Sequence, residues 1–172
     1  IHAGLYYKPG SLKARLCVDG RRALYQYCNE KRLPHRRCGK LVVAANASEE
    51  AYLDQLAQKA EANRVEEFEL VNTAGLKALE PSLQGLSALV SPCTGIIDSH
   101  ALMLSYQADI EAAGGTIVFR TPVLEPAIDG HAVKLRTGGV EPAELEASVV
   151  VNATGLDAWD SSSRVPGPPP AT

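Results

Sequence analysis

The sequence lacks the short motifs that mark several large enzyme classes. It contains no G-x-x-x-x-G-K-[ST] phosphate loop, no H-E-x-x-H zinc-protease helix and no G-x-S-x-G nucleophile turn. These absences exclude the P-loop, zinc-protease and serine-hydrolase mechanisms that depend on those motifs. The G-x-G-x-x-G dinucleotide fingerprint is missing too, so a protein of this kind that binds a dinucleotide needs its first βα unit outside these residues.

Long apolar runs and secretory features are also missing. No apolar stretch approaches the roughly eighteen residues that span a bilayer, and the first residues have neither a basic n-region nor an apolar h-region. The four cysteines form no C-x-x-C pair and no zinc-spaced cluster with histidine. We therefore expect a soluble chain with free thiols and no metal, in a reducing, cytoplasmic compartment, with membrane association of the whole protein left open.

What the sequence does have is ordinary globular composition with a strong charge asymmetry. Of its 172 residues, 45% are hydrophobic and 22% charged, which suits one domain or one domain plus part of another. Residues 1–40 contain ten lysines and arginines against two acidic residues. Such a segment either attracts an anion or forms a solvated helix face. Nucleic acid is the less favoured anion, because no aromatic stacking platform is interleaved with the basic residues.

The first half of the sequence predicts alternating helices and strands. Ser11 caps a helix to about Asn29, which Gly20 weakens, and residues 38–45 form a buried strand. Asn46 and Glu49 have the spacing of a capping box. The helix that follows places Leu53, Leu56 and Ala60 on one face.

The same alternation continues to a glycine pair. Residues 68–71 form a strand, and Asn72 then caps a short helix that ends before Pro81. Residues 86–91 form the next strand. Asp98 or Ser99 caps a helix whose apolar face carries Leu102, Tyr106, Ile110 and Ala113, and Gly114-Gly115 end it.

From residue 116 the pattern changes to strands. We expect strands at 116–120, 123–128, 131–136 and 143–147, with an Asp129-Gly130 hairpin turn. Residues 148–152 (SVVVN) are expected to form a fully buried strand, and the Ser/Pro/Gly-rich residues 161–172 a loose tail.

Two features could carry chemistry. The small-residue turn Asn152-Ala153-Thr154-Gly155 would let the backbone pass close to a cofactor, or is a structural turn only. His2, in an aromatic and glycine-rich opening, could act as a general base near neutral pH, or is a polar loop residue.

Several segments resemble, in order, the L-2-hydroxyglutarate dehydrogenase/oxidase family. The first is HAGLYYKPGSLKARLCVDGRRALYQYC, residues 2–28. CGKLVVA (38–44), LEP (79–81), TGIID (94–98) and NATGL (152–156) follow in register. The resemblance extends to about Asp160, so it covers nearly the whole chain.

The resemblance implies an α/β fold: an α+β substrate domain interleaved with part of an FAD-binding Rossmann-type domain, as in glycine-oxidase-like and D-amino-acid-oxidase-like flavoproteins. Residues 1–37 would follow the missing Rossmann unit. Residues 38–115 would belong to the substrate domain, 116–160 would return to the FAD domain, and 161–172 would be the tail.

The resemblance also implies roles for individual residues. It makes His2 the base that removes the hydroxyl proton of a 2-hydroxy acid while hydride leaves for FAD. Arg15, then Tyr7 and Lys13, would bind the substrate carboxylates, unless Lys13 and Arg15 are merely surface residues. FAD contacts are expected at Val123, Ala153, Thr154 and Gly155.

Alternatives stay open at this point. A related FAD oxidase of amino acids or glycerol 3-phosphate would share the scaffold. A non-enzymatic module in which residues 1–40 dock an acidic partner is a second alternative. The electron acceptor could be oxygen or a quinone, and residues 1–172 alone are expected to be inactive, because the phosphate-binding glycines and the C-terminal part of the family pattern are absent.

Overall fold

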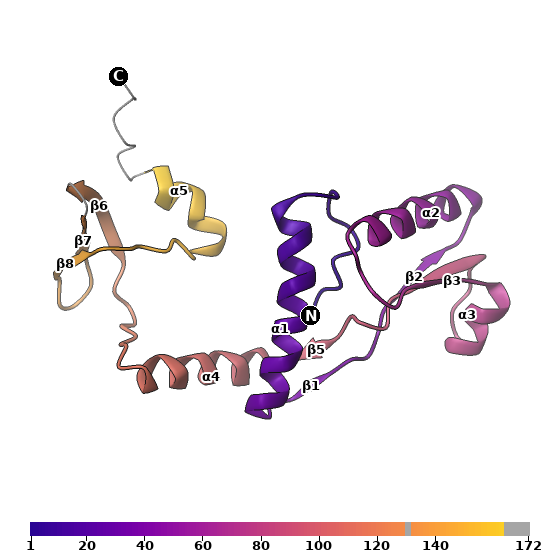
Figure 1. Cartoon of the computed structure of the whole chain (residues 1–172), viewed down its shortest axis with the longest axis horizontal. Coiled ribbons are helices and arrows are strands. Elements are labelled where there is room, and N and C mark those ends of the chain that lie inside the picture. The colour runs from indigo at the N-terminus through magenta and orange to yellow at the C-terminus, as the bar shows by residue number, and fades with distance from the viewer. Residues whose placement is uncertain (130–131, 164–172) are drawn as a thin grey trace, which may run out of the picture. The chain divides into compact units, whose positions relative to one another are not determined.

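The computed structural model describes residues 1–129 and 132–163 and divides the chain into two compact units. The first unit is Ile1–Ala113, and the second begins at Gly114. Helices and mostly antiparallel strands occur in both (Figure 1). The fold class is therefore α/β in the broad sense predicted from the sequence.

The first unit contains four helices and five strands along its described length. They are α1 (Leu12–Lys31), β1 (His35–Arg36), β2 (Leu41–Ala44), α2 (Ala47–Ala62), β3 (Glu69–Asn72), α3 (Thr73–Leu79), β4 (Ser87–Val90), β5 (Ile96–Ile97) and α4 (Ser99–Ala112). β4 lies between β2 and β3 in an antiparallel sheet, and β1 pairs with β5. The sequence did not predict the short strands β1 and β5, but the other elements confirm the predicted helices and strands, with boundaries shifted by up to three residues.

Side-chain caps explain where the helices begin. Ser11 Oγ accepts a hydrogen bond from the Ala14 amide at 3.2 Å, and Asn46 Oδ1 accepts one from the Glu49 amide at 3.1 Å. Glu49 reaches back to the amide of Ala45 at 2.7 Å, one residue earlier than in the standard capping box. At α4 the cap is Asp98, whose Oδ1 accepts from the Ala101 amide at 3.0 Å.

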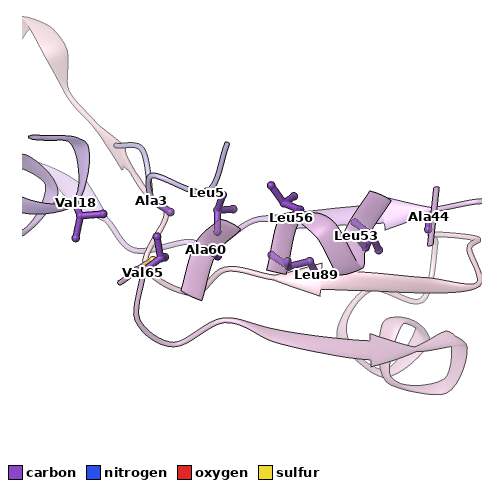
Figure 2. Packing of buried hydrophobic residues seen from close by; sticks show 10 residues of the cluster. Ala3, Leu5, Val18, Ala44, Leu53, Leu56, Ala60, Val65 and Leu89 are labelled. Atoms are coloured by element: carbon purple, nitrogen blue, oxygen red, sulfur yellow. The ribbon is translucent and has the colours of Figure 1, made fainter. Parts of the chain in front are cut away.

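The core of the first unit lies between α2, the β2-β4-β3 sheet and the opening loop. Leu53, Leu56 and Ala60 of α2 are buried, as their spacing predicted, and face Ala44 and Leu89 of the sheet (Figure 2). The same cluster takes in residues of the opening loop and of α1 (Ala3, Leu5 and Val18). Burial of apolar side chains at about 25 cal/mol per Å² therefore holds the opening loop as well as the helix.

The prediction that the apolar face of α4 is buried is wrong. None of its residues is buried, and Tyr106 and Ile110 are exposed. Polar contacts hold α4 to α1 instead: the Tyr27 hydroxyl donates to Asp109 Oδ2 at 2.8 Å, and Lys31 pairs with Asp109. The hydrogen bonds from Lys31 and Tyr27 lower the pKa of Asp109.

The second unit is built on an antiparallel meander, as predicted. It consists of β6 (Val123–Asp129), β7 (Ala132–Thr137) and β8 (Glu144–Ala147), followed by the 3-10 turn η1 (Gly155–Asp157) and α5 (Ala158–Ser163). The strand expected at 116–120 does not form, and those residues form no ladder with any described strand. Gly130 of the expected turn and His131 lie outside the described residues.

The prediction of a buried strand at 148–152 is wrong for this structure. These residues are irregular, and Val149, Val150 and Val151 are 76%, 45% and 81% exposed. A strand needs a neighbour to satisfy its amides and carbonyls, and no described strand pairs with this segment. Residues 161–163, expected in a loose tail, end α5, and residues 164–172 lie outside the described part.

One buried arginine connects α1 to the loop after α2. The side chain of Arg21 is only 3% exposed and pairs with Glu66, which also pairs with Arg22. Partial burial acts to raise the pKa of Glu66, but the hydrogen bonds from both arginines prevail and lower it to about 2. A depressed carboxyl pKa stabilises the fold above the unfolded-state value, and that contribution is lost as pH falls from about 4.5 towards 2.

We expect Glu66→Gln to lower the free energy of unfolding by about 1–2 kcal/mol at pH 7, because the buried Arg21 guanidinium loses its charge partner. The figure is smaller than for a fully buried ion pair, because the carboxylate is partly exposed to water. Urea unfolding at pH 7 and pH 3 checks this. The difference from wild type should shrink at pH 3. Glu61→Gln, which removes an exposed α2 carboxylate with no ion pair to another described residue, is the control. An equal loss in both variants would contradict the assignment.

Candidate functional site

The opening loop, residues 1–10, is anchored from three directions. The backbone nitrogen of Ile1 donates to the Gly95 carbonyl at 2.7 Å, and the Gly95 amide donates back to the Ile1 carbonyl at 3.1 Å. Asn63 Nδ2 donates to the carbonyls of Gly4 and Tyr7 at 3.2 and 2.9 Å. With Ala3 and Leu5 buried beneath, the loop holds His2 and Tyr7 in defined positions.

Gly4 is required where the loop crosses α1. Its φ of +98° lies in the left-handed region, and a Cβ there would lie 2.9 Å from Val18 Cγ2. A larger residue would therefore meet both backbone strain and a collision with α1.

His2 is exposed and lines a small hollow of about 20 Å³, roughly the space of one water molecule. Tyr6, Tyr7, Lys40 and Thr94 line it as well. The Lys40 ammonium lies 4.7 Å from the centre of the Tyr6 ring, a cation–π contact. Lys40 and Tyr6 were not among the predicted site residues, although both lie inside the segments that carry the family resemblance.

Tyr7 connects this hollow to a second, shallow one of about 600 Å³, which Lys13 and Cys17 also line. The Lys13 ammonium lies 4.7 Å from the centre of the Tyr7 ring. Among the predicted site residues of the first unit, His2, Tyr7 and Lys13 therefore lie along one continuous surface.

Arg15 lies elsewhere. It lines a third cavity, between α1 and the end of α2, that includes none of His2, Tyr7 and Lys13. Two positions along a helix turn the side chain by about 200°, so Lys13 and Arg15 leave α1 on opposite sides. The structure brings three of the four predicted residues together and separates the one ranked first for the carboxylates.

Cys17 beside this surface is not an activated nucleophile. Burial raises the pKa of its thiol against the lowering effect of Arg21 and Lys13. A thiol with a raised pKa stays protonated at neutral pH and is a poor nucleophile. The four cysteines are free, as predicted.

The predicted cofactor turn of the second unit is organised by Asn152. Its Oδ1 accepts from the Thr154 amide at 3.2 Å and from the Thr154 hydroxyl at 2.7 Å. Its Nδ2 donates to the Ala158 carbonyl and the Ser162 hydroxyl at 2.8 and 2.9 Å. The turn exposes the backbone of residues 153–155, which suits contact with a bound group.

Gly155 and Val123 are also available for contact. Gly155 has φ +63°, and a Cβ there would meet no described atom within 4 Å, so its backbone angle is what favours glycine. Val123 begins β6 beside a register shift and is 53% exposed. Both positions are accessible to a bound group, but the described residues contain no glycine-rich βα turn that could cradle the phosphates of a dinucleotide.

Neither a metal-binding cluster nor a membrane-spanning helix occurs in the described residues. No group of three or more histidine, cysteine, aspartate or glutamate side chains is arranged to hold a metal ion there. No helix within the described part has the length and apolarity to cross a bilayer.

Comparison with known proteins adds a family and relatives. The family of FAD dependent oxidoreductases, DAO, matches residues 1–170. Mitochondrial L-2-hydroxyglutarate dehydrogenase of Nematostella vectensis is 44% identical over 117 residues, 68% of this chain and 26% of the relative. The enzyme of that name from Homo sapiens is 37% identical over 91% of this chain and 36% of the relative. The one from Arabidopsis thaliana is 33% identical over 97% of this chain and 40% of the relative.

Solved structures agree on the fold. L-alpha-glycerophosphate oxidase from Mycoplasma pneumoniae, with FAD bound, superposes with a TM-score of 0.80 at 21% identity, over 95% of this chain and 44% of that one. Glycine oxidase from Geobacillus kaustophilus gives 0.78 at 20% identity, over 94% and 45%. The chain thus spans less than half the length of these proteins, and at such identity the likeness concerns the fold alone.

Two glycine substitutions should have opposite effects. Gly4→Ala should lower the free energy of unfolding by about 1–3 kcal/mol, because the added Cβ collides with Val18 at a left-handed backbone angle. Gly20→Ala, in the open interior of α1, should raise it by about 0.5–1 kcal/mol. Denaturant unfolding of both variants checks the pair. Unchanged or higher stability in Gly4→Ala would show that the loop does not cross α1 as described.

Proposed function

Because the chain belongs to the DAO family of FAD-dependent oxidoreductases, we propose that the whole protein oxidises L-2-hydroxyglutarate to 2-oxoglutarate with FAD as its cofactor. The observation that carries this proposal is the identity of 33–44% to enzymes named L-2-hydroxyglutarate dehydrogenase. The family match over residues 1–170 supports the cofactor. The chain covers 26–40% of those relatives, so the activity belongs to a protein of their length.

In this proposal His2 removes the proton of the substrate hydroxyl. Its exposed position on an anchored loop supports the role, because a general base must reach the substrate from a defined place. When bound, FAD supplies the acceptor for the hydride that leaves the carbinol carbon.

Lys13 and Tyr7 bind substrate carboxylates on the same surface. A cation stacked on a tyrosine ring keeps its charge available while its side chain has little freedom. The Lys40–Tyr6 pair repeats this arrangement beside His2 and adds a second cation that suits a dicarboxylate. Arg15 shares none of these hollows, so a direct role in the same site lacks the geometric support that Lys13 and Tyr7 have.

The cofactor contacts are proposed at Val123 and at the turn Ala153, Thr154 and Gly155. Their exposure and the hydrogen bonds around Asn152 support this role. We retain the division into a substrate portion, residues 38–115, and a returning FAD portion, residues 116–160, as part of the proposal.

The nearest competing function is oxidation of an amino acid or of glycerol 3-phosphate, because proteins named glycine oxidase and L-alpha-glycerophosphate oxidase share the fold. Dye reduction by the full-length protein across 2-hydroxy acids, glycine and glycerol 3-phosphate separates them. Faster reduction by either of the last two would replace our choice of substrate. The same assay with oxygen or a quinone identifies the electron acceptor.

The sequence led us to expect a cytoplasmic location. The names of the relatives include the word mitochondrial and so do not support that expectation. A polyanion-binding module at residues 1–40 stays an untested alternative. Subcellular fractionation and salt-dependent polyanion binding address the two points separately.

His2→Asn should slow flavin reduction by L-2-hydroxyglutarate by about 10²–10⁴-fold, because a positioned general base contributes that much. Anaerobic stopped-flow measurement at 450 nm, on the full-length protein with its flavin bound, checks this. His100→Asn, which changes an exposed histidine of α4 outside the described hollows, should leave the rate unchanged. A normal rate in His2→Asn would remove His2 from the mechanism.

Asn152→Ala should weaken FAD binding by about three- to tenfold, since the turn loses its internal hydrogen bonds and must be ordered by the cofactor instead. The increase of flavin fluorescence on dilution measures release independently of turnover. Asn29→Ala, an exposed asparagine on α1, is the control. Unchanged affinity in Asn152→Ala would place the flavin elsewhere.

A further inference from the structure

A cavity between α1 and the end of α2 has no role in the proposed oxidation. It has a volume of about 580 Å³ and lies wholly in the first unit. One face of α1, including Ser11, Arg15, Asp19 and Arg22, forms one wall, and Asn63 and Arg64 form the other. It shares no lining residue with the His2 hollow, and only Leu12 with the hollow that Tyr7 and Lys13 line.

The charges on its walls are unbalanced. Arg22 is neutralised by Glu66 and by Asp19, the latter at 3.4 Å. Arg15 and Arg64 are exposed, and neither forms an ion pair with another described residue. Since Asp19 already has its partner, two guanidinium groups at the cavity are left without an anion.

Asn63 adds a polar group that needs a donor. Both of its printed hydrogen bonds use Nδ2, which donates to Gly4 and Tyr7. Its Oδ1 is buried and accepts no hydrogen bond from any described residue. A buried acceptor without a donor is uncommon in native structures and calls for a water or a ligand.

We propose that this cavity binds a small hydroxy-carboxylate anion. Arg15 and Arg64 hold its carboxylates, because a guanidinium pairs with a carboxylate in a bidentate manner. The ligand's hydroxyl donates to the free oxygen of Asn63 after a local shift of that side chain, because Asn63 lines the cavity while its oxygen is buried in this structure. The site is independent of the proposed oxidation, since it shares no lining residue with the His2 hollow.

Citrate is a suitable probe, because its carbinol carbon carries no hydrogen and cannot be oxidised to a ketone by hydride transfer. Tricarballylate is the same tricarboxylate without the hydroxyl, and inorganic phosphate is an anion without carboxylates. Calorimetric titration of the full-length protein with its flavin bound should rank citrate first, tricarballylate several-fold weaker and phosphate weakest. Equal binding of citrate and phosphate, or no binding of citrate, would overturn the proposal.

The chain offers a closely matched pair of variants. Arg64 and Arg32 are both exposed, both lie within two residues after a helix and both have left-handed φ angles, +57° and +55°. Arg64→Ala should weaken citrate binding by about tenfold, the effect of one charge-assisted hydrogen bond. Arg32 does not line the cavity, so Arg32→Ala removes the same charge at a left-handed backbone position elsewhere. It should change citrate binding by less than about twofold. An equal loss in both would show only long-range charge attraction.

One further variant separates this proposal from the proposed enzyme function. His2→Asn should bind citrate as the unaltered protein does, even though its flavin reduction is slow. A loss of citrate binding in His2→Asn would mean that the anion occupies the substrate site, and the separate cavity site would be withdrawn.

Discussion

The packing of the opening loop into the core determines where the candidate residues of the first unit lie. Ala3 and Leu5 occupy the same apolar cluster as Leu56 and Ala60 of α2. Since the loop has no helix or sheet to satisfy its backbone, its carbonyls depend on outside donors, chiefly Asn63 and Gly95. The exposed His2 and the half-buried Tyr7 thus lie on a segment that also contains the buried Ala3 and Leu5. The segment cannot move away without exposing the apolar core to water.

Local chemistry made much of the first unit predictable. Ser11, Asn46, Asn72 and Asp98 cap the helices that follow them, because a short polar side chain directly before a periodic segment satisfies free helix amides. The apolar spacing of α2 identified its buried face. These features depend on neighbours within a few residues, which the sequence contains.

The predictions that failed concern features that depend on residues far away in the sequence. Residues 148–152 have the composition of a central strand, yet a strand requires a pairing edge, and no described strand offers one. The apolar face of α4 likewise finds too little cover to be buried: Tyr106 packs on the Tyr27 ring, with the ring centres 5.1 Å apart, but no residue of α4 is buried. At the site, helix spacing puts Arg15 and Lys13 on opposite sides of α1, but it could not show that the Lys13 side faces Tyr7, because that depends on how α2 and the loop pack on α1. Lys40 lies directly before β2, far from His2 in the sequence, so only the fold brings it to His2.

The three adjacent valines of the second unit have a consequence for handling the chain. Val149, Val150 and Val151 combine high β-propensity with exposure and no charge between them. A segment of this kind can pair its unsatisfied backbone with the same segment of another molecule, which is the first step of aggregation. In a cell, polypeptide limited to these residues would therefore be a natural client for chaperones and proteases until complementary strands covered the valines.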